Sequence, residues 1–358
     1  MFTKKYKDTL QRYEDFWERK NTNRGVINMW YPDPNRPRFP APASLEQQWL
    51  DEEYQVAKYK YIEQYNTFVG EGIPMLFTNL GPGCLAACIG GNYGLASNTV
   101  WFDREAIITD WEALPNIEFD ENSEMWQHVL RMQKRYAEDP DVHFSITDLG
   151  GVMDIIASLR TTNDLLYDLY DYPEEIKALK SRVLEMWSRA YDQQVETIRK
   201  TGQPYNNWMN IPSAKPWYPL QCDFCYMISP DHFDEFVLPD LIAQAKQVER
   251  PVYHLDGVGE LAHLDKILDI PGLAGIQWAP GAGEAPEWDE KWFPVYKKIQ
   301  DKKKNLILLR GISGKDNDVE GIEKLTKNLD PTGVYLKGAV PDRKSAEKLM
   351  NIFENWTR

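Results

Sequence analysis

The sequence predicts an α/β fold, a single (β/α)8 barrel with additional helices at its N-terminus. From Val252 onward, four apolar runs each precede a helix-like segment, and this alternation is typical of a parallel sheet. Four earlier apolar runs bring the number of predicted strands to eight, which closes a barrel. No repeat or flexible linker divides the chain, so we expect one domain over residues 1–358.

The N-terminal segment, residues 1–66, is expected to wrap on the barrel. Its first twenty residues place aromatic side chains among charges, as in an amphipathic helix. The proline-rich stretch 31–42 must be extended, because proline interrupts helices. Ser44 and Gln47 then match a capping box, which predicts a long helix that ends near Asn66.

The predicted strands matter most for function, because active sites of such barrels lie at the C-terminal ends of the strands. Helices are expected at residues 122–138, from Pro173 to Thr201, and after Ser229, which caps a helix with Pro230 at its first position. The strands are expected at residues 25–30, 73–77, 143–147, 204–208, 252–255, 274–278, 306–309 and 334–336.

Polar and aromatic side chains dominate the ends of these strands. Packing explains one or two such residues, but a pocket for a small organic molecule, with aromatic walls and a polar base, explains the whole set. Asn210, Arg310 and Lys337 are among these residues. The side chains that we expect to bind the substrate are Trp30, Tyr31, Asn79, Asp148, Trp208, Gln277, Trp278 and Glu284.

The stretch from Tyr253 to Gly257 is the centre of the predicted site. Side chains alternate along a strand, so His254 and Asp256 share one face and converge. A neutral imidazole can bind zinc or act as a general base, and a carboxylate can orient it or ligate beside it. The structural alternative is a core histidine bonded to a helix-capping aspartate. We predict that His254, Asp256 and Asp223 are catalytic, and that His254 and Asp256 are metal ligands.

The cysteines give a weaker metal signal. Cys222 and Cys225 form a lone Cys-x-x-Cys, whereas a strong zinc motif contains a second pair. Cys84 and Cys88 lie among alanines and are expected to be small core residues. Cys222 is therefore a weak candidate ligand, and Asp223 beside it is expected to face the pocket.

Composition excludes several classes of partner. With 55 acidic and 41 basic residues, the net charge is −14, which argues against nucleic acid and anionic membranes. No apolar run has the length of a membrane span, and the first twenty residues lack the apolar part of a signal peptide. Four cysteines make no disulfide framework, so we expect a reduced, cytoplasmic protein.

Four segments, found in order between residue 140 and residue 355, carry a family resemblance. They are Asp148 to Gly151 with Leu159-Arg160 and Tyr172-Pro173-Glu174; Asp223 with Ser229-Pro230-Asp231-His232-Phe233; Tyr253 to Gly257; and the last strand and helix from Gly333. This set resembles the uroporphyrinogen decarboxylase superfamily, which includes the cobamide-dependent methyltransferases. The resemblance implies a single (β/α)8 barrel with extra N-terminal helices.

The chain is more similar to the methyltransferase-like members than to true uroporphyrinogen decarboxylases. The latter carry an arginine-rich motif, Arg-Gln-Ala-Gly-Arg-Tyr, where this chain has residues 28–32, Asn-Met-Trp-Tyr-Pro. For the methyltransferases, the resemblance implies zinc held by His-x-Cys and a later cysteine, and a corrinoid carried by a partner. Here Asp256 replaces the first cysteine, and no cysteine follows Cys225. Two alternatives stay open. The first is a metal site made of His254 and oxygen ligands, and the second is acid–base catalysis without a metal.

Three functions fit these observations. The first is methyl transfer, linked to a corrinoid, that involves a small organic substrate. The second is a cobamide-independent lyase, decarboxylase or hydrolase that acts on a carbohydrate-like or aromatic acid, as the tryptophans and paired carboxylates indicate. The third is a non-catalytic ligand-binding protein. The expected partners are a small-molecule substrate and a corrinoid protein, and a homodimer is left open.

Overall fold

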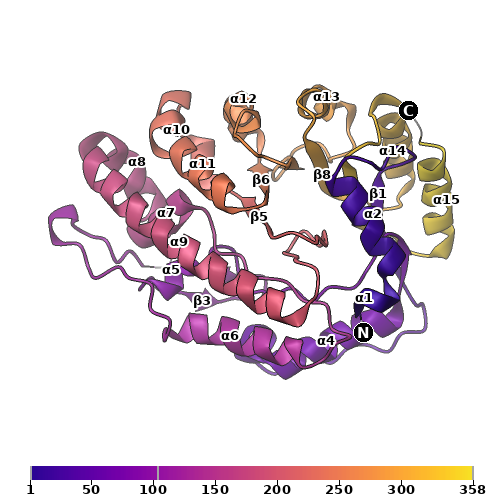
Figure 1. Ribbon diagram of the computed structural model, residues 1–358, viewed down its shortest axis with the longest axis horizontal. Coiled ribbons are helices and arrows are strands. Elements are labelled where there is room, and N and C mark those ends of the chain that lie inside the picture. The colour runs from indigo at the N-terminus through magenta and orange to yellow at the C-terminus, as the bar shows by residue number, and fades with distance from the viewer. Residues whose placement is uncertain (1, 103–104, 357–358) are drawn as a thin grey trace.

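A computed structural model describes residues 2–102 and 105–356 of the chain. Its main sheet has seven strands in the order β2-β1-β9-β8-β7-β6-β5, and every pair is parallel except β1 with β2. Figure 1 shows the later helices outside these strands, around a central interior, in a barrel-like α/β fold. The strands are β1 (Val26–Pro32), β2 (Asn66–Gly70), β5 (Trp217–Leu220), β6 (Arg250–Asp256), β7 (Gly275–Ala279), β8 (Asn305–Ile312) and β9 (Val334–Ala339).

Helices surround the sheet, and a two-stranded hairpin of β3 (Gly94–Leu95) and β4 (Val100–Trp101) lies apart from it. The helices of the first half are α1 (Phe2–Lys5), α2 (Lys7–Trp17), α3 (Leu45–Leu50), α4 (Glu52–Tyr65), α5 (Leu85–Cys88), α6 (Glu124–Ala137), α7 (Val152–Arg160), α8 (Thr162–Asp171) and α9 (Pro173–Thr201). Those of the second half are α10 (Pro230–Phe236), α11 (Leu238–Gln247), α12 (Leu264–Leu268), α13 (Phe293–Asp301), α14 (Asp316–Asn328) and α15 (Arg343–Glu354).

The long helix expected after Ser44 is two helices. Ser44 caps α3, as predicted, but the chain leaves the helical conformation at Asp51, whose side chain accepts from the N–H groups of Glu53 and Tyr54 and so caps α4. The segment after α4 is the strand β2, which pairs antiparallel with β1. The capping aspartate in mid-sequence is the physical reason for the break.

Two expected strands form a single parallel bridge instead of a ladder. Residues 73–77 and 143–147 pair only at Leu76 and Phe144. There the N–H of Leu76 donates to the carbonyl oxygen of His143 at 2.8 Å, and the N–H of Ser145 donates to that of Leu76 at 3.1 Å. Pro74 lacks an N–H group and cannot extend the pairing. Among the described residues, eight regular strands therefore do not close the sheet into a barrel.

The expected strand at residues 204–208 is wrong. Tyr205 makes one antiparallel bridge with Ser213, and the strand that pairs with β6 is β5, farther along the chain. Asparagines cause the difference, because Asn206 Oδ1 accepts from the next N–H at 2.9 Å and Asn207 Oδ1 accepts from Met209 N–H at 3.1 Å. Such local bonds compete with a strand ladder.

Residues 206–211, here called the plug segment, occupy the interior of the sheet (Figure 1). Met209 and Ile211 pack with apolar side chains that point inward from several strands. The Tyr335 hydroxyl, on β9, lies 2.9 Å from the carbonyl oxygen of Asn210, to which it donates, and accepts from Asn28 Nδ2 at 3.0 Å. The plug segment is therefore held by both apolar packing and buried hydrogen bonds.

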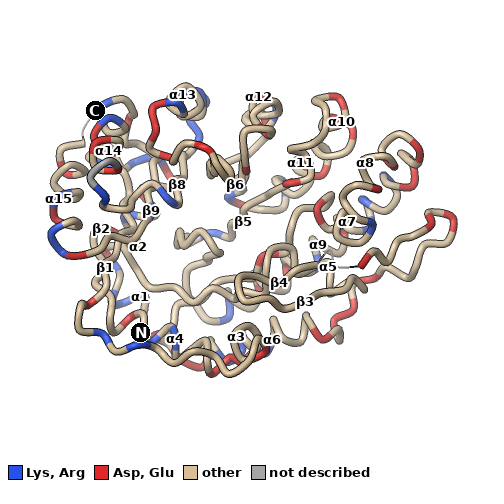
Figure 2. The backbone as a smooth tube through the Cα atoms, turned by 180° about the vertical axis from the view of Figure 1, so that it is seen from behind, with Lys and Arg blue, Asp and Glu red and all other residues tan. Residues whose placement is uncertain are grey.

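Charge is distributed unevenly over the surface. Figure 2 shows acidic residues along the outer loops and helices, including the region of α8 and α10.

Across residues 2–102 and 105–356, no helix combines the length and the apolar character that crossing a bilayer requires.

We predict that Tyr335→Phe destabilises the fold through the plug segment. The substitution removes a buried donor and acceptor, and an unsatisfied buried polar group costs about 1–3 kcal/mol. Urea unfolding should show a fall of that size in the free energy of unfolding. The matched control is Tyr167→Phe on α8, where the side chain is 72% exposed and the stability should not change. Equal stability of both variants and wild type would contradict the proposed role of the hydroxyl.

Candidate functional site

His254 occupies the interior face at the C-terminal end of β6, beside Gln277 of β7 in parallel register. Its Nδ1 is hydrogen-bonded to Gln277 Oε1, while Gln277 Nε2 donates to Trp278 O at 2.8 Å and so keeps the amide oxygen turned toward the imidazole. Because a carbonyl oxygen only accepts, Nδ1 carries the proton. The lone pair of Nε2 is therefore free to bind a metal or accept a proton.

His254, Asp256 and Asp223 converge, as the sequence predicts. His254 Nε2 lies 3.8 Å from Asp256 Oδ2, and one potential ligand atom from each of the three side chains lies within 4.8 Å of the others. The chain turns away immediately after Asp256 at Gly257, whose φ of 92° and contact with the ring of Tyr226 leave no room for a Cβ. One imidazole and two carboxylates suit a divalent cation with open positions for substrate. We call these three residues the ligand triad.

Carboxylates accumulate around the ligand triad. Burial raises the pKa of Asp148 to about 6. Burial also raises the pKa of Asp154, and the neighbouring charge of Asp223 raises it further. The pKa of Asp223 is raised by burial, against the effect of His254, although the residue is exposed toward the cavity that it lines. A bound cation would relieve this repulsion, so the electrostatics of the site fit a metal.

Two cavities are lined by residues of the ligand triad. The α7 cavity has a volume of about 270 Å³. It is lined by Asp223, by residues of α7, and by Gln221 and Phe224, which follow β5 in the chain. The β7 cavity has a volume of about 590 Å³ and is lined by His254 and Asp256 together with the loop after β7. The ligand triad thus contributes side chains to both spaces.

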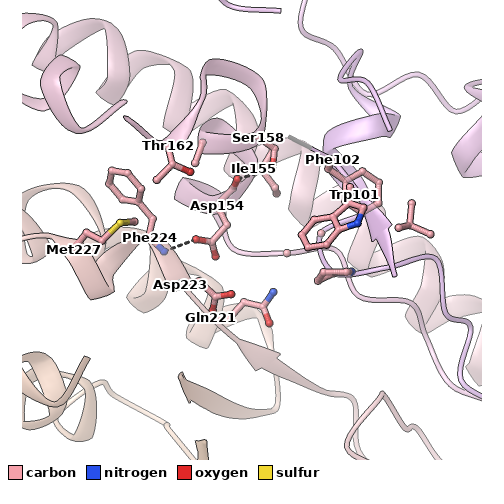
Figure 3. A pocket seen from close by; sticks show the side chains of 15 residues that line it. Trp101, Phe102, Asp154, Ile155, Ser158, Thr162, Gln221, Asp223, Phe224 and Met227 are labelled. Carbon is pink, nitrogen blue, oxygen red and sulfur yellow. Dashed lines mark hydrogen bonds between the residues drawn. The ribbon is translucent and has the colours of Figure 1, made fainter. Parts of the chain in front are cut away.

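Figure 3 shows the α7 cavity, with Asp154, Asp223 and Gln221 facing Trp101 and Phe102. Asp154 Oδ1 accepts from the N–H of Phe224 at 2.8 Å, whereas its Oδ2 is buried without a partner among the described residues. A charged oxygen left free in this position adds to the attraction for a cation or a donor group.

Asp148 lies behind the α7 cavity and does not line it. Its Oδ1 accepts from the Tyr218 hydroxyl at 3.1 Å and from Gln221 Nε2 at 3.4 Å. Gly151 allows this arrangement, because a Cβ there would lie 2.1 Å from the carbonyl oxygen of Gln221. Asp148 therefore positions Gln221. The sequence instead predicts that Asp148 contacts the substrate directly.

The β7 cavity joins aromatic and ionisable walls. Trp208, from the plug segment, packs edge-on against His254 with ring centroids 5.1 Å apart. Glu284 lines the cavity, and its carboxylate lies 2.6 Å from Lys291 Nζ. Glu287 also lines it, and burial raises the pKa of this carboxyl to about 8.

Several predicted site residues lie elsewhere. Trp278 is fully buried against Trp292, because it alternates with the inward-facing Gln277 and so faces the helix layer. Cys222 is buried beside Cys225, and burial raises the pKa of its thiol. Neither of the two cavities is lined by Trp30, Tyr31 or Asn79.

Three further residues of the site were missed from the sequence. Asp154 occupies the first turn of α7, where an acidic residue reads as ordinary helix capping. Gln221 follows a strand that the sequence did not predict. Glu287 stands in a proline-rich loop, where a charged residue normally faces water. Its neighbours Pro286, which is exposed, and Trp288, which is half-buried, give no local signal that Glu287 is buried.

The ligand triad should bind Zn²⁺. We expect near-stoichiometric zinc in protein purified without a tag or chelator, and its loss in His254→Ala. Gln277→Leu should weaken zinc binding about 10–100-fold, because the imidazole loses the bond that orients it. The matched control is His232→Ala, on α10, which should retain zinc. Calorimetric titration measures the affinities, and zinc binding unaffected by His254→Ala would exclude the triad as the site.

Glu287 should make stability depend on pH. In the folded state its pKa is about 8, whereas the ordinary value is 4.5. Between these values the folded state holds the extra proton, so the free energy of unfolding contributed by Glu287 falls as pH rises and levels off above pH 8. Glu287→Gln lacks this contribution. In urea unfolding, the free energy of unfolding of the variant should therefore increase relative to that of wild type as pH rises from about 5 to about 9. Glu290→Gln, an exposed control, should follow wild type throughout; a constant gap for Glu287→Gln would contradict the raised pKa.

Comparisons with known proteins bear on the fold. No family model matches the chain, and no curated protein matches it. Among solved structures, the chain is similar to a methyltransferase from Methanosarcina mazei, with a TM-score of 0.63 and 13% sequence identity over 97% of this chain and 98% of the other. At this identity the likeness shows that the two chains share a fold along nearly their whole length.

Proposed function

We propose that this protein transfers a methyl group between a small organic substrate and a corrinoid carried by a partner protein. The observation that carries the proposal is that the ligand triad, whose ligand atoms lie within 4.8 Å of one another, lines the α7 cavity through Asp223 and the β7 cavity through His254 and Asp256. Group transfer requires donor and acceptor to reach one point in defined orientation. The shared fold with a solved methyltransferase supports the proposal at the level of architecture.

Asp223, His254 and Asp256 would hold a divalent metal, zinc being the ion that the family resemblance implies. When bound, such an ion supplies Lewis-acid chemistry and stabilises negative charge on a substrate heteroatom. That charge arises because the electron pair of the broken bond stays on the heteroatom when the methyl group leaves. Gln277 keeps the imidazole in its ligating tautomer, and Trp208 covers one side of it against water.

The two cavities suit different partners. The β7 cavity has the size of a small-molecule site, which ranges over about 300–1,000 Å³. The α7 cavity is smaller, and apolar side chains stand exposed around it, with Trp101 at 44% and Met227 at 48% exposure. Exposed apolar groups beside a cavity favour a protein contact. We therefore assign the substrate to the β7 cavity and the corrinoid partner to the α7 cavity.

Methyl exchange with a cobamide tests this function. Zinc-loaded protein, mixed with methylcobalamin and a panel of thiol, amine and hydroxyl acceptors, should demethylate the cobamide in an absorbance assay. His254→Ala should slow the reaction about a hundredfold or more, because the group that holds the reacting centre is gone. His232→Ala should react within about twofold of wild type. Wild-type inactivity with every cobamide and acceptor would overturn the proposal.

A second candidate is a cobamide-independent lyase or decarboxylase. The specific observation is the buried Asp154 beside Asp223, two carboxyls whose raised pKa values are typical of an acid–base pair. Turnover of an organic acid without cobamide, lost in Asp154→Asn, would favour this function.

A further inference from the structure

We propose that the β7 cavity binds the carboxylate of a small organic acid between Arg310 and Glu287. The inference deepens the proposed function, because it names the class of substrate whose methyl-bearing end would lie at His254. It rests on the charges, the hydrogen bonds and the lining of this cavity.

Arg310 supplies a positive charge to the lining of the cavity. It is exposed, it lines the cavity, and no ion pair or side-chain hydrogen bond joins it to the side chains that the structure describes. Glu284, another acidic residue of the lining, is paired with Lys291. A free guanidinium is a planar fork that binds a carboxylate through two parallel hydrogen bonds.

Glu287 supplies a second donor next to Arg310. Its side chain is buried, and its Oε2 accepts from the backbone N–H of Arg310 at 2.8 Å, so the two residues are held together. Its Oε1 has no hydrogen-bond partner among the described residues. With a pKa of about 8, this carboxyl is neutral near pH 7 and its O–H can donate. A carboxylate offers acceptors only, which matches a guanidinium and a neutral acid.

The remaining lining explains why the ligand should also have an apolar body. Ala279, Pro280 and Leu309 lie in the wall with Trp208. A volume of about 590 Å³ exceeds what a simple anion fills. An acid with an aliphatic or aromatic body therefore fits better than an inorganic anion, and the opposite end of such a ligand would meet the ligand triad.

Matched pairs of acids and amides test the proposal. Calorimetric titration of zinc-loaded protein would compare 4-methoxybenzoate with 4-methoxybenzamide, and methoxyacetate with methoxyacetamide. At least one acid should bind about 10–100-fold more tightly than its amide, as charged hydrogen bonds require. Arg310→Gln should remove this preference. Glu287→Leu should weaken the acid about tenfold, and Glu287→Gln should restore it, because the glutamine amide donates in place of the protonated carboxyl.

The control is Arg343→Gln on α15, where the arginine pairs with Glu347 at 2.7 Å and should not affect binding. If no acid exceeds its amide, or if Arg310→Gln keeps the preference, the carboxylate subsite is overturned; the second result would place the acid on the metal instead. The titration contains no cobamide, so its failure is distinct from a failure of methyl transfer. Acid selectivity without any methyl exchange would overturn the proposed function alone.

Discussion

The hydrogen bond between Gln277 and His254 is the interaction on which the site depends. Parallel pairing of β6 with β7 puts the two side chains next to each other, and the backbone oxygen of Trp278 holds the amide in one orientation. The imidazole must then carry its proton on Nδ1, and its Nε2 lone pair lies beside the carboxylates of Asp256 and Asp223, where a cation would join the three groups. A register shift of one residue in β7 would replace Gln277 by an apolar neighbour and release the histidine.

The plug segment is the second constraint, because it fills an interior that strands alone leave open. Its asparagines satisfy their own backbone, and Asn28 and Tyr335 complete the buried hydrogen bonds. These bonds reduce the cost of burying the segment, although Asn207 Nδ2 and Trp208 Nε1 are buried without a partner among the described residues. Its consequence for function is the placement of Trp208 against His254, on a support that also ties β1 to β9.

Burial assigns different chemistry to similar side chains around the cavities. Burial and the neighbouring charge of Asp223 raise the pKa of Asp154 beside the ligand triad, where a cation would stabilise both carboxylates. Glu287 lies away from other carboxylates, so burial alone keeps it neutral beside Arg310. The β7 cavity is therefore lined both by His254 and Asp256, which suit a cation, and by Arg310, which suits an anion.

The sequence by itself determined the features that depend on near neighbours. The alternation of strands and helices after Val252, the capping by Ser44 and Ser229, and the shared face of His254 and Asp256 are all local, and the structure has each of them. Only the tertiary structure decided that Gln277 faces inward and Trp278 outward, because β7 is buried on both faces and carries no polar pattern. It also decided that Trp217 to Leu220 is the strand beside β6, and that Asp154 and Glu287 join the site. Strand register and burial arise from contacts between distant residues, which no local pattern records.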